Sequence, residues 1–282
     1  MKKSSVVASI TSLLLAATLI TIPSNAHADS QKEVIQQANQ NVVVLSQKQQ
    51  KTAAVKVYDQ AFTEFKRGDQ DAAITDLETA SNLGNATAAA ELGELYQNGF
   101  HEYTLKSGFD YKKARTWNSI AAAMGQGRGY TNNGILYYSG WGVKKNLNTA
   151  ITNFKKGYAL KDMKAPRYLG QIYDAKKNYK TAANYYQAAY KSGDITGGIN
   201  LAQLYLDGNG VKKDTTAAIK IYKKLLKDAH GNAKAGDAAV AWGDLYANGK
   251  YVKKDTAKAK TIYQKGVKLG SDAAKQALTK LN

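Results

Sequence analysis

The sequence predicts an all-α fold, a right-handed α/α solenoid of stacked helical hairpins. A two-part pattern of small, aromatic and capping residues returns at roughly 32–41 residues, a period typical of helical repeat arrays. Only two prolines occur in 282 residues, and Ala, Lys, Leu and Gln, which favour helix, are abundant. One such hairpin cannot bury its apolar faces alone, so the repeats are expected to stack.

Residues 1–28 have the pattern of a secretory signal. Two lysines precede an uncharged, mainly apolar run over residues 6–22, and Ala26 and Ala28 offer the small side chains that signal peptidase requires. A run of this length also matches a membrane anchor, for which about 17–25 apolar residues suffice. The Ser and Thr residues within the run and the Ala-x-Ala site favour cleavage, which leaves Asp29 as the new N-terminus.

The chain contains no cysteine, which excludes disulfides, thiolate catalysis, thiolate metal sites and the lipid anchor of a lipoprotein. We therefore expect an exported protein, periplasmic or secreted, that carries no lipid. The formal net charge is +18. Such an excess of positive charge attracts polyanions in general, including anionic wall polymers, acidic lipid headgroups, nucleic acid and acidic proteins. The charge alone does not indicate which of these classes binds.

The first part of the repeat pattern is a small residue followed three positions later by tyrosine. Residues three apart lie on one face of a helix, so each pair is expected to place a gap and a large side chain side by side on a face that packs against neighbouring helices. The pairs are Gly93 with Tyr96, Gly134 with Tyr137, Gly170 with Tyr173, Ala202 with Tyr205, and Gly243 with Tyr246.

The second part is Asp or Asn, then alanine four positions later, then a large residue after four more. The Asp or Asn is expected to cap the second helix, and the other two to form its buried stripe. The sets are Asp69-Ala73-Leu77, Asn146-Ala150-Phe154, Asn178-Ala182-Tyr186, Asp214-Ala218-Tyr222 and Asp255-Ala259-Tyr263. Asp110-Ala114 begins in the same way, but its aromatic residue, Trp117, comes one position early.

Most repeats place a glycine turn between the two parts, where glycine supplies the left-handed backbone that ends the first helix. Three turns also carry a lysine pair directly before the capping residue. These pairs are Lys144-Lys145, Lys212-Lys213 and Lys253-Lys254. Stacked repeats would align them along one edge as a candidate anion-binding site, whereas the alternative is that each lysine only solvates its turn.

The strings Leu-Gly-Glu-Leu-Tyr from Leu92 and Gly-Asn-Gly-Val-Lys-Lys-Asp from Gly208 resemble the Sel-one-like repeat, which is related to the tetratricopeptide repeat. The resemblance covers five units over residues 88–270. It implies a scaffold for protein complexes of a bacterial-type cell envelope or secretome. The third unit departs from the pattern because it lacks the glycine turn, and the first carries an insertion over residues 100–107.

This organisation divides the chain into a signal, a connecting segment and a solenoid. Residues 29–54 are expected to be a linker or a docked helix. Residues 55–282 form the solenoid. It consists of a tetratricopeptide-like hairpin at 55–87, the five repeats at 88–270 and a capping helix at 271–282, which covers the last apolar face.

No catalytic, cofactor or metal site is expected. His101 and His230 lie far apart in different repeats, without the paired spacing of metal ligands, and are interpreted as turn residues. A weaker alternative is a hydrolase, because one cysteine-rich branch of the family carries a beta-lactamase label. That branch's cysteines, the Ser-x-x-Lys motif and the Gly-x-Ser-x-Gly motif are all absent. Glycines 125, 127 and 129 lack the context of a phosphate loop and indicate an inter-repeat turn.

Seven tyrosines do not recur with the repeat, and each is either partly buried or a contact on a binding surface. They are Tyr103, Tyr111, Tyr130, Tyr138, Tyr168, Tyr185 and Tyr190. We expect a protein or peptide partner on a concave surface lined by the first helices. The alternative is polyanion or cell-wall polymer binding through the lysine edge. Nucleic acid is not an expected partner.

Overall fold

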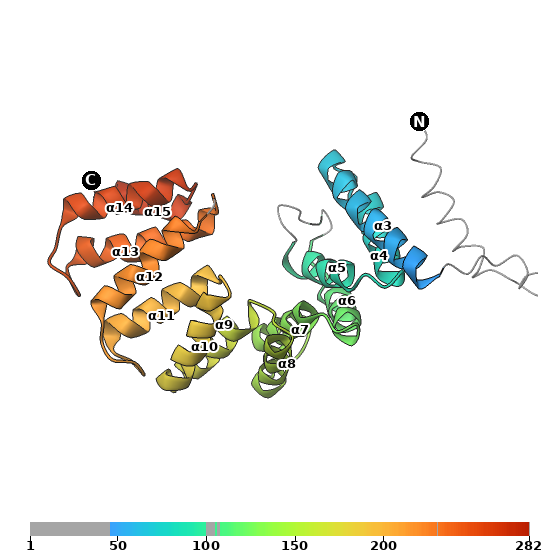
Figure 1. Cartoon of the computed structure of the whole chain (residues 1–282), viewed down its shortest axis with the longest axis horizontal. Coiled ribbons are helices and arrows are strands. Elements are labelled where there is room, and N and C mark those ends of the chain that lie inside the picture. The colour runs from blue at the N-terminus through green and yellow to red at the C-terminus, as the bar shows by residue number, and fades with distance from the viewer. Residues whose placement is uncertain (1–45, 100–104, 106–107, 230, 282) are drawn as a thin grey trace, which may run out of the picture. The chain divides into compact units, whose positions relative to one another are not determined.

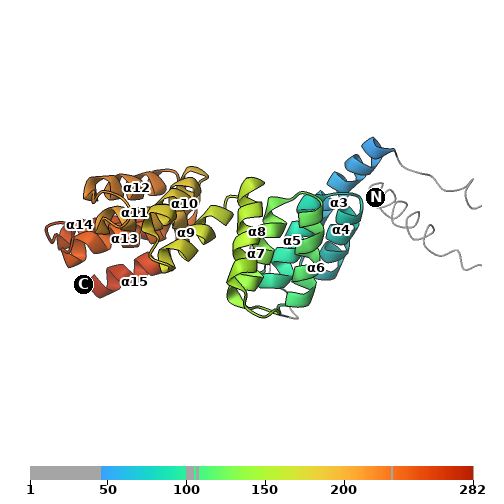
Figure 2. The same cartoon turned by 90° about the horizontal axis from the view of Figure 1, so that it is seen from below.

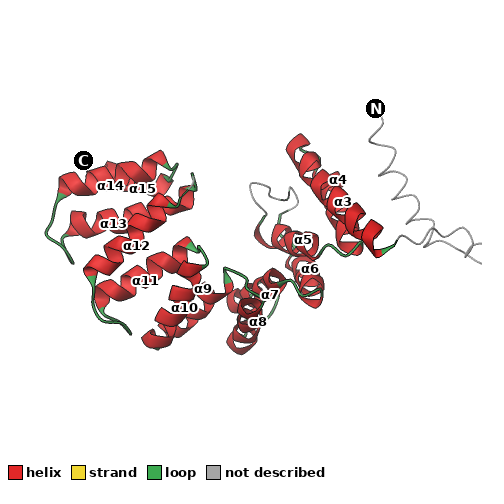
Figure 3. Ribbon diagram, in the orientation of Figure 1, coloured by secondary structure: helices red, strands yellow, loops and turns green. Residues whose placement is uncertain are grey.

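The computed structural model describes residues 46–99, 105, 108–229 and 231–281. Within these residues the chain is all-α, with thirteen α-helices, one short 3-10 helix and no strand (Figure 3). The helices form successive antiparallel hairpins, which confirms the predicted fold class. The secretory signal at 1–28, residues 29–45 of the connecting segment, Tyr103, His101 and His230 lie outside the described residues.

The chain forms two compact units, divided between Gly129 and Tyr130. The helices of the first unit are α3 (Gln47–Arg67), α4 (Gln70–Asn82), α5 (Ala86–Asn98) and α6 (Tyr111–Ala123). The division falls inside α7 (Gly127–Ser139), whose first residues belong to the first unit. Consecutive helices pack together from α3 to α6 (Figure 2).

The first helix begins at Gln47, within the segment for which the sequence left a linker or a docked helix open. Ser46 caps it in a capping box with Gln49, which satisfies two backbone donors at the start of the helix. The helix ends at Gly68, which has φ 82°. The adjacent Asp69 then caps α4, so a two-residue turn joins the two helices.

The hairpin of α5 and α6 differs from the others in its buried stripe. Asn118 occupies the position that the pattern assigns to a large residue, eight residues after the capping Asp110, and it is fully buried. Its amide donates to the side-chain oxygen of Gln97 at 3.3 Å, and it lies directly against Gly93. Trp117, the aromatic residue that comes one position early in this set, is half-buried beside it.

The second unit continues the hairpins. Its remaining helices are α8 (Leu147–Ala159), α9 (Ala165–Ala175), α10 (Tyr179–Lys191), α11 (Ile195–Asp207), α12 (Thr215–Lys227), η1 (Ala233–Ala235), α13 (Gly236–Asn248), α14 (Thr256–Lys268) and α15 (Asp272–Leu281). We call the first helix of each hairpin helix A and the second helix B. Helices A α9, α11 and α13 contact one another in sequence, and each packs on its own helix B (Figure 1).

Each hairpin is closed by the predicted capping residue in the same way. The side chains of the six Asp and Asn residues accept from backbone N–H groups in the first turn of helix B, as predicted. In addition, the backbone N–H of Asp214 donates to the carbonyl of Tyr205 at 2.8 Å, and Asp255 donates likewise to Tyr246 at 2.9 Å. The tyrosine of the first pattern and the cap of the second are therefore joined across the turn.

The small residue of the first pattern makes room for the large residue of the second. A Cβ atom on Gly134 would lie 2.6 Å from the Phe154 ring, and one on Gly170 would overlap the ring of Tyr186. Gly243 faces Tyr263 in the same way. In each of these hairpins the aromatic residue of helix B fills the space beside the glycine of helix A.

The α9–α10 turn replaces glycine with lysine. Lys177 has φ 58° and stands directly before the capping Asn178. A left-handed backbone is unfavourable for a residue with a Cβ atom, so this turn stores strain that glycine avoids elsewhere. The other turns have positive φ at Gly140, Gly208 and Gly249, as predicted.

Helix α15 ends the described chain and packs on both α14 and α13. Ser271 caps its N-terminus, because the Ser271 hydroxyl accepts from the backbone N–H of Ala274 at 3.2 Å. Ala274 is fully buried against Gly266 of α14. The helix has the position that the sequence assigns to a C-terminal cap.

Candidate functional site

The four helix A to helix B turns of the second unit each carry a lysine pair directly before the capping residue. Three of these pairs were predicted, and all six of their lysines are exposed. The fourth is Lys176-Lys177, also exposed, in the turn without glycine. We call these eight residues the lysine edge. The fourth pair was not predicted from the sequence because its turn lacks glycine. Its position directly before the capping Asn178 would have been enough to identify it.

The second lysine of each glycine-containing turn has a fixed backbone position. A Cβ atom added to Gly208 would lie 3.1 Å from the Cβ of Lys213, and the corresponding distance from Gly249 to Lys254 is 3.0 Å. The turn glycine therefore lies against the lysine stem. Because this geometry repeats, the lysines leave each turn from equivalent positions.

Neighbouring turns contact each other. Gly210, in the α11–α12 turn, lies against the backbone of Tyr179 at the start of α10. In the next turn, the hydroxyl of Tyr251 donates to Asp207 at the end of α11. The turns from α9 to α14 thus follow one another along one edge of the second unit.

Asp207, at the end of α11, lies among the lysines of this edge. Burial acts to raise the pKa of Asp207, but hydrogen bonds from Gln203 and Tyr251 and the charges of Lys250 and Lys213 hold that pKa below its usual range. The ammonium groups of Lys250 and Lys213 lie 4.6 Å and 5.8 Å from the centroid of the Tyr251 ring. Tyr251 is therefore a cation-binding platform between two turns.

Charge in the second unit is divided by helix type. The B helices α8, α10, α12 and α14 contain no Asp or Glu but many lysines. These lysines are Lys155, Lys156, Lys180, Lys191, Lys220, Lys223, Lys224, Lys227, Lys258, Lys260, Lys265 and Lys268. With the lysine edge, they give the B side of this unit a strongly cationic surface.

The A helices α9, α11 and α13 have the opposite character, since they contain no lysine. Their one arginine, Arg167, is neutralised by Asp194 at 3.0 Å. Gln203 and Asp237 are exposed on these helices, and Gln171 and Asp244 are half-buried. This surface offers amides and carboxylates, which are suited to hydrogen bonding with a polypeptide.

The non-recurring tyrosines are half-buried wherever they are described, at positions 111, 130, 138, 168, 185 and 190. Tyr168 stacks on Phe154 with ring centroids 4.9 Å apart, and Tyr185 stacks on Tyr173 at 5.6 Å. These contacts contribute packing to the second unit.

The first unit contains a buried polar group of a different kind. Glu91 is only 4% exposed; it accepts from the Tyr58 hydroxyl at 2.8 Å, and Arg128 lies 3.6 Å from the same oxygen. Its other oxygen has no hydrogen-bond partner among the described residues. Burial raises the pKa of Glu91 to about 7, although Tyr58 and Arg128 oppose the shift.

The described residues contain no cluster of three or more His, Asp or Glu side chains able to hold a metal ion. Among the helices of this part of the chain, none combines the length and apolar character needed to cross a bilayer.

The stacked hairpins and the polar A-helix surface define an α/α repeat scaffold. The sequence model of the Sel1 repeat matches residues 86–126, 130–162, 167–194, 199–228 and 236–271, and the chain belongs to the Sel1 repeat family. Proteins of this family are scaffolds for protein–protein interaction.

Three known proteins show the range of this similarity. The chain is 29% identical over 54% of its length to the ERAD-associated E3 ubiquitin-protein ligase component HRD3B of Arabidopsis thaliana, and spans 18% of that protein. A Sel1 repeat protein from Oxalobacter formigenes is 27% identical with a TM-score of 0.60, over 79% of this chain and 86% of that one. The protective antigen c5321 of uropathogenic Escherichia coli has the same fold at 21% identity, with a TM-score of 0.57 over 91% and 59% of the two chains.

Proposed function

We propose that this protein is an exported scaffold that binds a protein or peptide partner on the surface of its A helices, where helical repeats form their concave face. The observation that carries the proposal is the division of charge in the second unit, which leaves α9, α11 and α13 without lysine. A polypeptide has both donors and acceptors to satisfy, and the amides and carboxylates of this surface supply partners for both. The family's role in protein interaction supports the same conclusion.

The proposal is tested by adding charge to one surface or the other. Gln171→Lys with Gln203→Lys places two cations on the A helices, whereas Asn184→Lys with Gln264→Lys places two on the B helices as a matched control. Partner capture from the organism's envelope extract should fall sharply for the A-helix variant and persist for the control. Equal capture by both variants would show that the A helices do not contact the partner.

A second candidate function is binding of an anionic envelope polymer through the lysine edge. It is favoured by the four exposed lysine pairs, three of which lie on adjoining turns. Changing the eight lysines to glutamine should leave melting nearly unchanged, because exposed turn charges contribute little to stability. Binding to a polyanion should weaken, and its dependence on log salt should become shallower as fewer counterions are released. If the dependence of polyanion binding on log salt did not change, the lysines would only solvate their turns.

Export is the remaining part of the proposal, and it is supported by the signal pattern of residues 1–28. N-terminal sequencing of the protein recovered from outside the cytoplasm should begin at Asp29. Recovery of an uncut chain in the membrane fraction would contradict cleavage and favour an anchor.

A further inference from the structure

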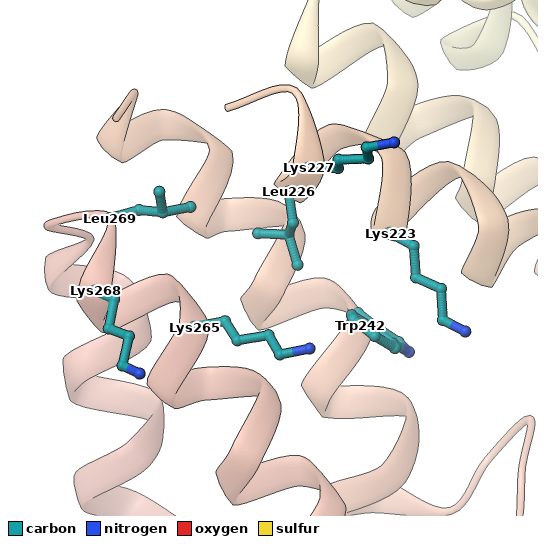
Figure 4. A pocket seen from close by; sticks show the side chains of 7 residues that line it. All are labelled: Lys223, Leu226, Lys227, Trp242, Lys265, Lys268 and Leu269. Carbon is teal, nitrogen blue, oxygen red and sulfur yellow. The ribbon is translucent and has the colours of Figure 1, made fainter. Parts of the chain in front are cut away.

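A pocket of about 400 Å³ opens on the B-helix side of the second unit, between α12 and α14 (Figure 4). Trp242 of α13 lies between the two helices, with Leu226 and Leu269 also lining the space. Four lysines complete the lining: Lys223 and Lys227 from α12, and Lys265 and Lys268 from α14. None of the lining residues carries a negative charge.

Two of the lysines lie over the indole from opposite sides of the pocket. The Nζ atom of Lys223 is 5.7 Å from the centroid of the Trp242 ring, and that of Lys265 is 5.5 Å away. Cations on an indole face gain electrostatic attraction, but two on one ring repel each other. By contrast, the neighbouring Lys224 is paired with Asp228 at 2.6 Å. A bound anion would relieve the repulsion inside the pocket, where no carboxylate does so.

Trp242 is itself a departure from the repeat. The residue directly before the small residue of helix A is leucine in two other repeats of this unit, Leu169 and Leu201, and both are buried. Trp242 is 6% exposed, and its indole N–H is buried without a hydrogen-bond partner among the described residues. An unpaired buried donor costs stability, and leucine would fill the position without that cost. Packing alone therefore does not account for the indole.

We propose that this pocket binds an acidic peptide segment of a partner protein, with one apolar or aromatic side chain against Trp242 and Leu226 and carboxylates beside the lysines. The apolar lining separates this ligand from a phosphate or sugar polymer, which has charge but no apolar group to bury. The inference rests on the proposed function only in taking the partner to be a protein. Its site is separate from the A-helix surface.

The test uses calorimetry on the full chain with two capped peptides, Glu-Glu-Phe-Glu-Glu and Glu-Glu-Gly-Glu-Glu, and with inorganic polyphosphate. The phenylalanine peptide should bind at least about tenfold more tightly than the glycine peptide, because only it buries an apolar group. Equal affinity for the two peptides, or tighter binding of polyphosphate than of the phenylalanine peptide, would overturn the proposal.

Variants locate the binding. Lys223→Gln with Lys265→Gln should lower the affinity for the phenylalanine peptide by about tenfold or more, since two charge-assisted contacts are lost. Lys220→Gln with Lys275→Gln removes the same charge from exposed positions outside the pocket and should change affinity less than about twofold. Trp242→Leu introduces the residue that two other repeats of this unit carry, and it should retain the melting temperature while losing the preference for phenylalanine. Equal weakening by both lysine pairs would mean that only net charge is recognised.

These outcomes are independent of the A-helix test. If the pocket fails while Gln171→Lys with Gln203→Lys still abolishes partner capture, the scaffold function stands without this site. If capture is insensitive to the A-helix variant but lost with Lys223→Gln and Lys265→Gln, the pocket stands and the A-helix surface does not.

Discussion

The contact between Gly170 and Tyr186 gives the sharpest stability prediction. Tyr186 is 1% exposed, and its hydroxyl donates to Asp174 at 3.2 Å, so the ring has little freedom to move. A Cβ atom on Gly170 would overlap that ring. Overpacking of this kind costs roughly 1–3 kcal/mol. Against this, alanine gains up to about 1 kcal/mol over glycine inside a helix.

We therefore expect Gly170→Ala to destabilise the second unit by about 1–2 kcal/mol, and Gly170→Leu by about 3 kcal/mol or more. Urea unfolding followed by circular dichroism measures both. Ala202 holds the equivalent position in the next hairpin, and Ala202→Gly is the matched control. It should cost about 1 kcal/mol of helix propensity and about 1 kcal/mol more for the lost buried methyl group, without the overpacking that alanine brings at Gly170.

A double-mutant cycle tests the cause. Tyr186→Leu should cost stability alone, yet combined with Gly170→Ala it should cost less than the sum, because the smaller side chain leaves room for the new methyl group. Strictly additive effects, or an unchanged unfolding curve for Gly170→Ala, would refute the packing proposed for this face.

Three further predictions concern single residues. In the first unit, burial raises the pKa of Glu91 from 4.5 to about 7, so the folded state holds this proton more tightly than the unfolded chain. The stability that this group contributes should be fully present below pH 4.5 and should be lost as the pH rises to about 7. Unfolding measured against pH should show this loss, and Glu91→Gln should flatten that part of the curve. Lys177→Gly should stabilise the second unit by roughly 1 kcal/mol in urea unfolding, since glycine adopts the left-handed backbone without a Cβ clash. Asp214→Ala should cost about 1 kcal/mol through loss of the cap on α12, whereas alanine at the exposed Lys212 should change the midpoint little.

Much of the architecture follows from local chemistry and was predictable. The capping residues, the left-handed turn glycines and the buried alanines of the B helices are encoded within a few residues of where they act, so spacing was enough to place them. Recurrence of the same order of residues then fixed the hairpin as the repeating unit. Three of the four lysine pairs of the lysine edge were recognisable in the sequence for the same reason. The fourth pair was missed because Lys177 replaces the turn glycine there.

The rest required side chains from different hairpins or different helices to meet. Spacing placed Gly170 on a face that packs against the neighbouring helix, but only the structure identifies the Tyr186 ring as the group that fills the space. The buried Asn118 has no signal in the sequence, because a polar residue in the apolar stripe is explained only by its contact with Gln97. The pocket at Trp242 likewise depends on lysines from α12 and α14, brought together by the stacking of two hairpins. Sequence periodicity determined which residues face inward, and tertiary packing decided which of them meet, because contacts between elements depend on distances that no local pattern records.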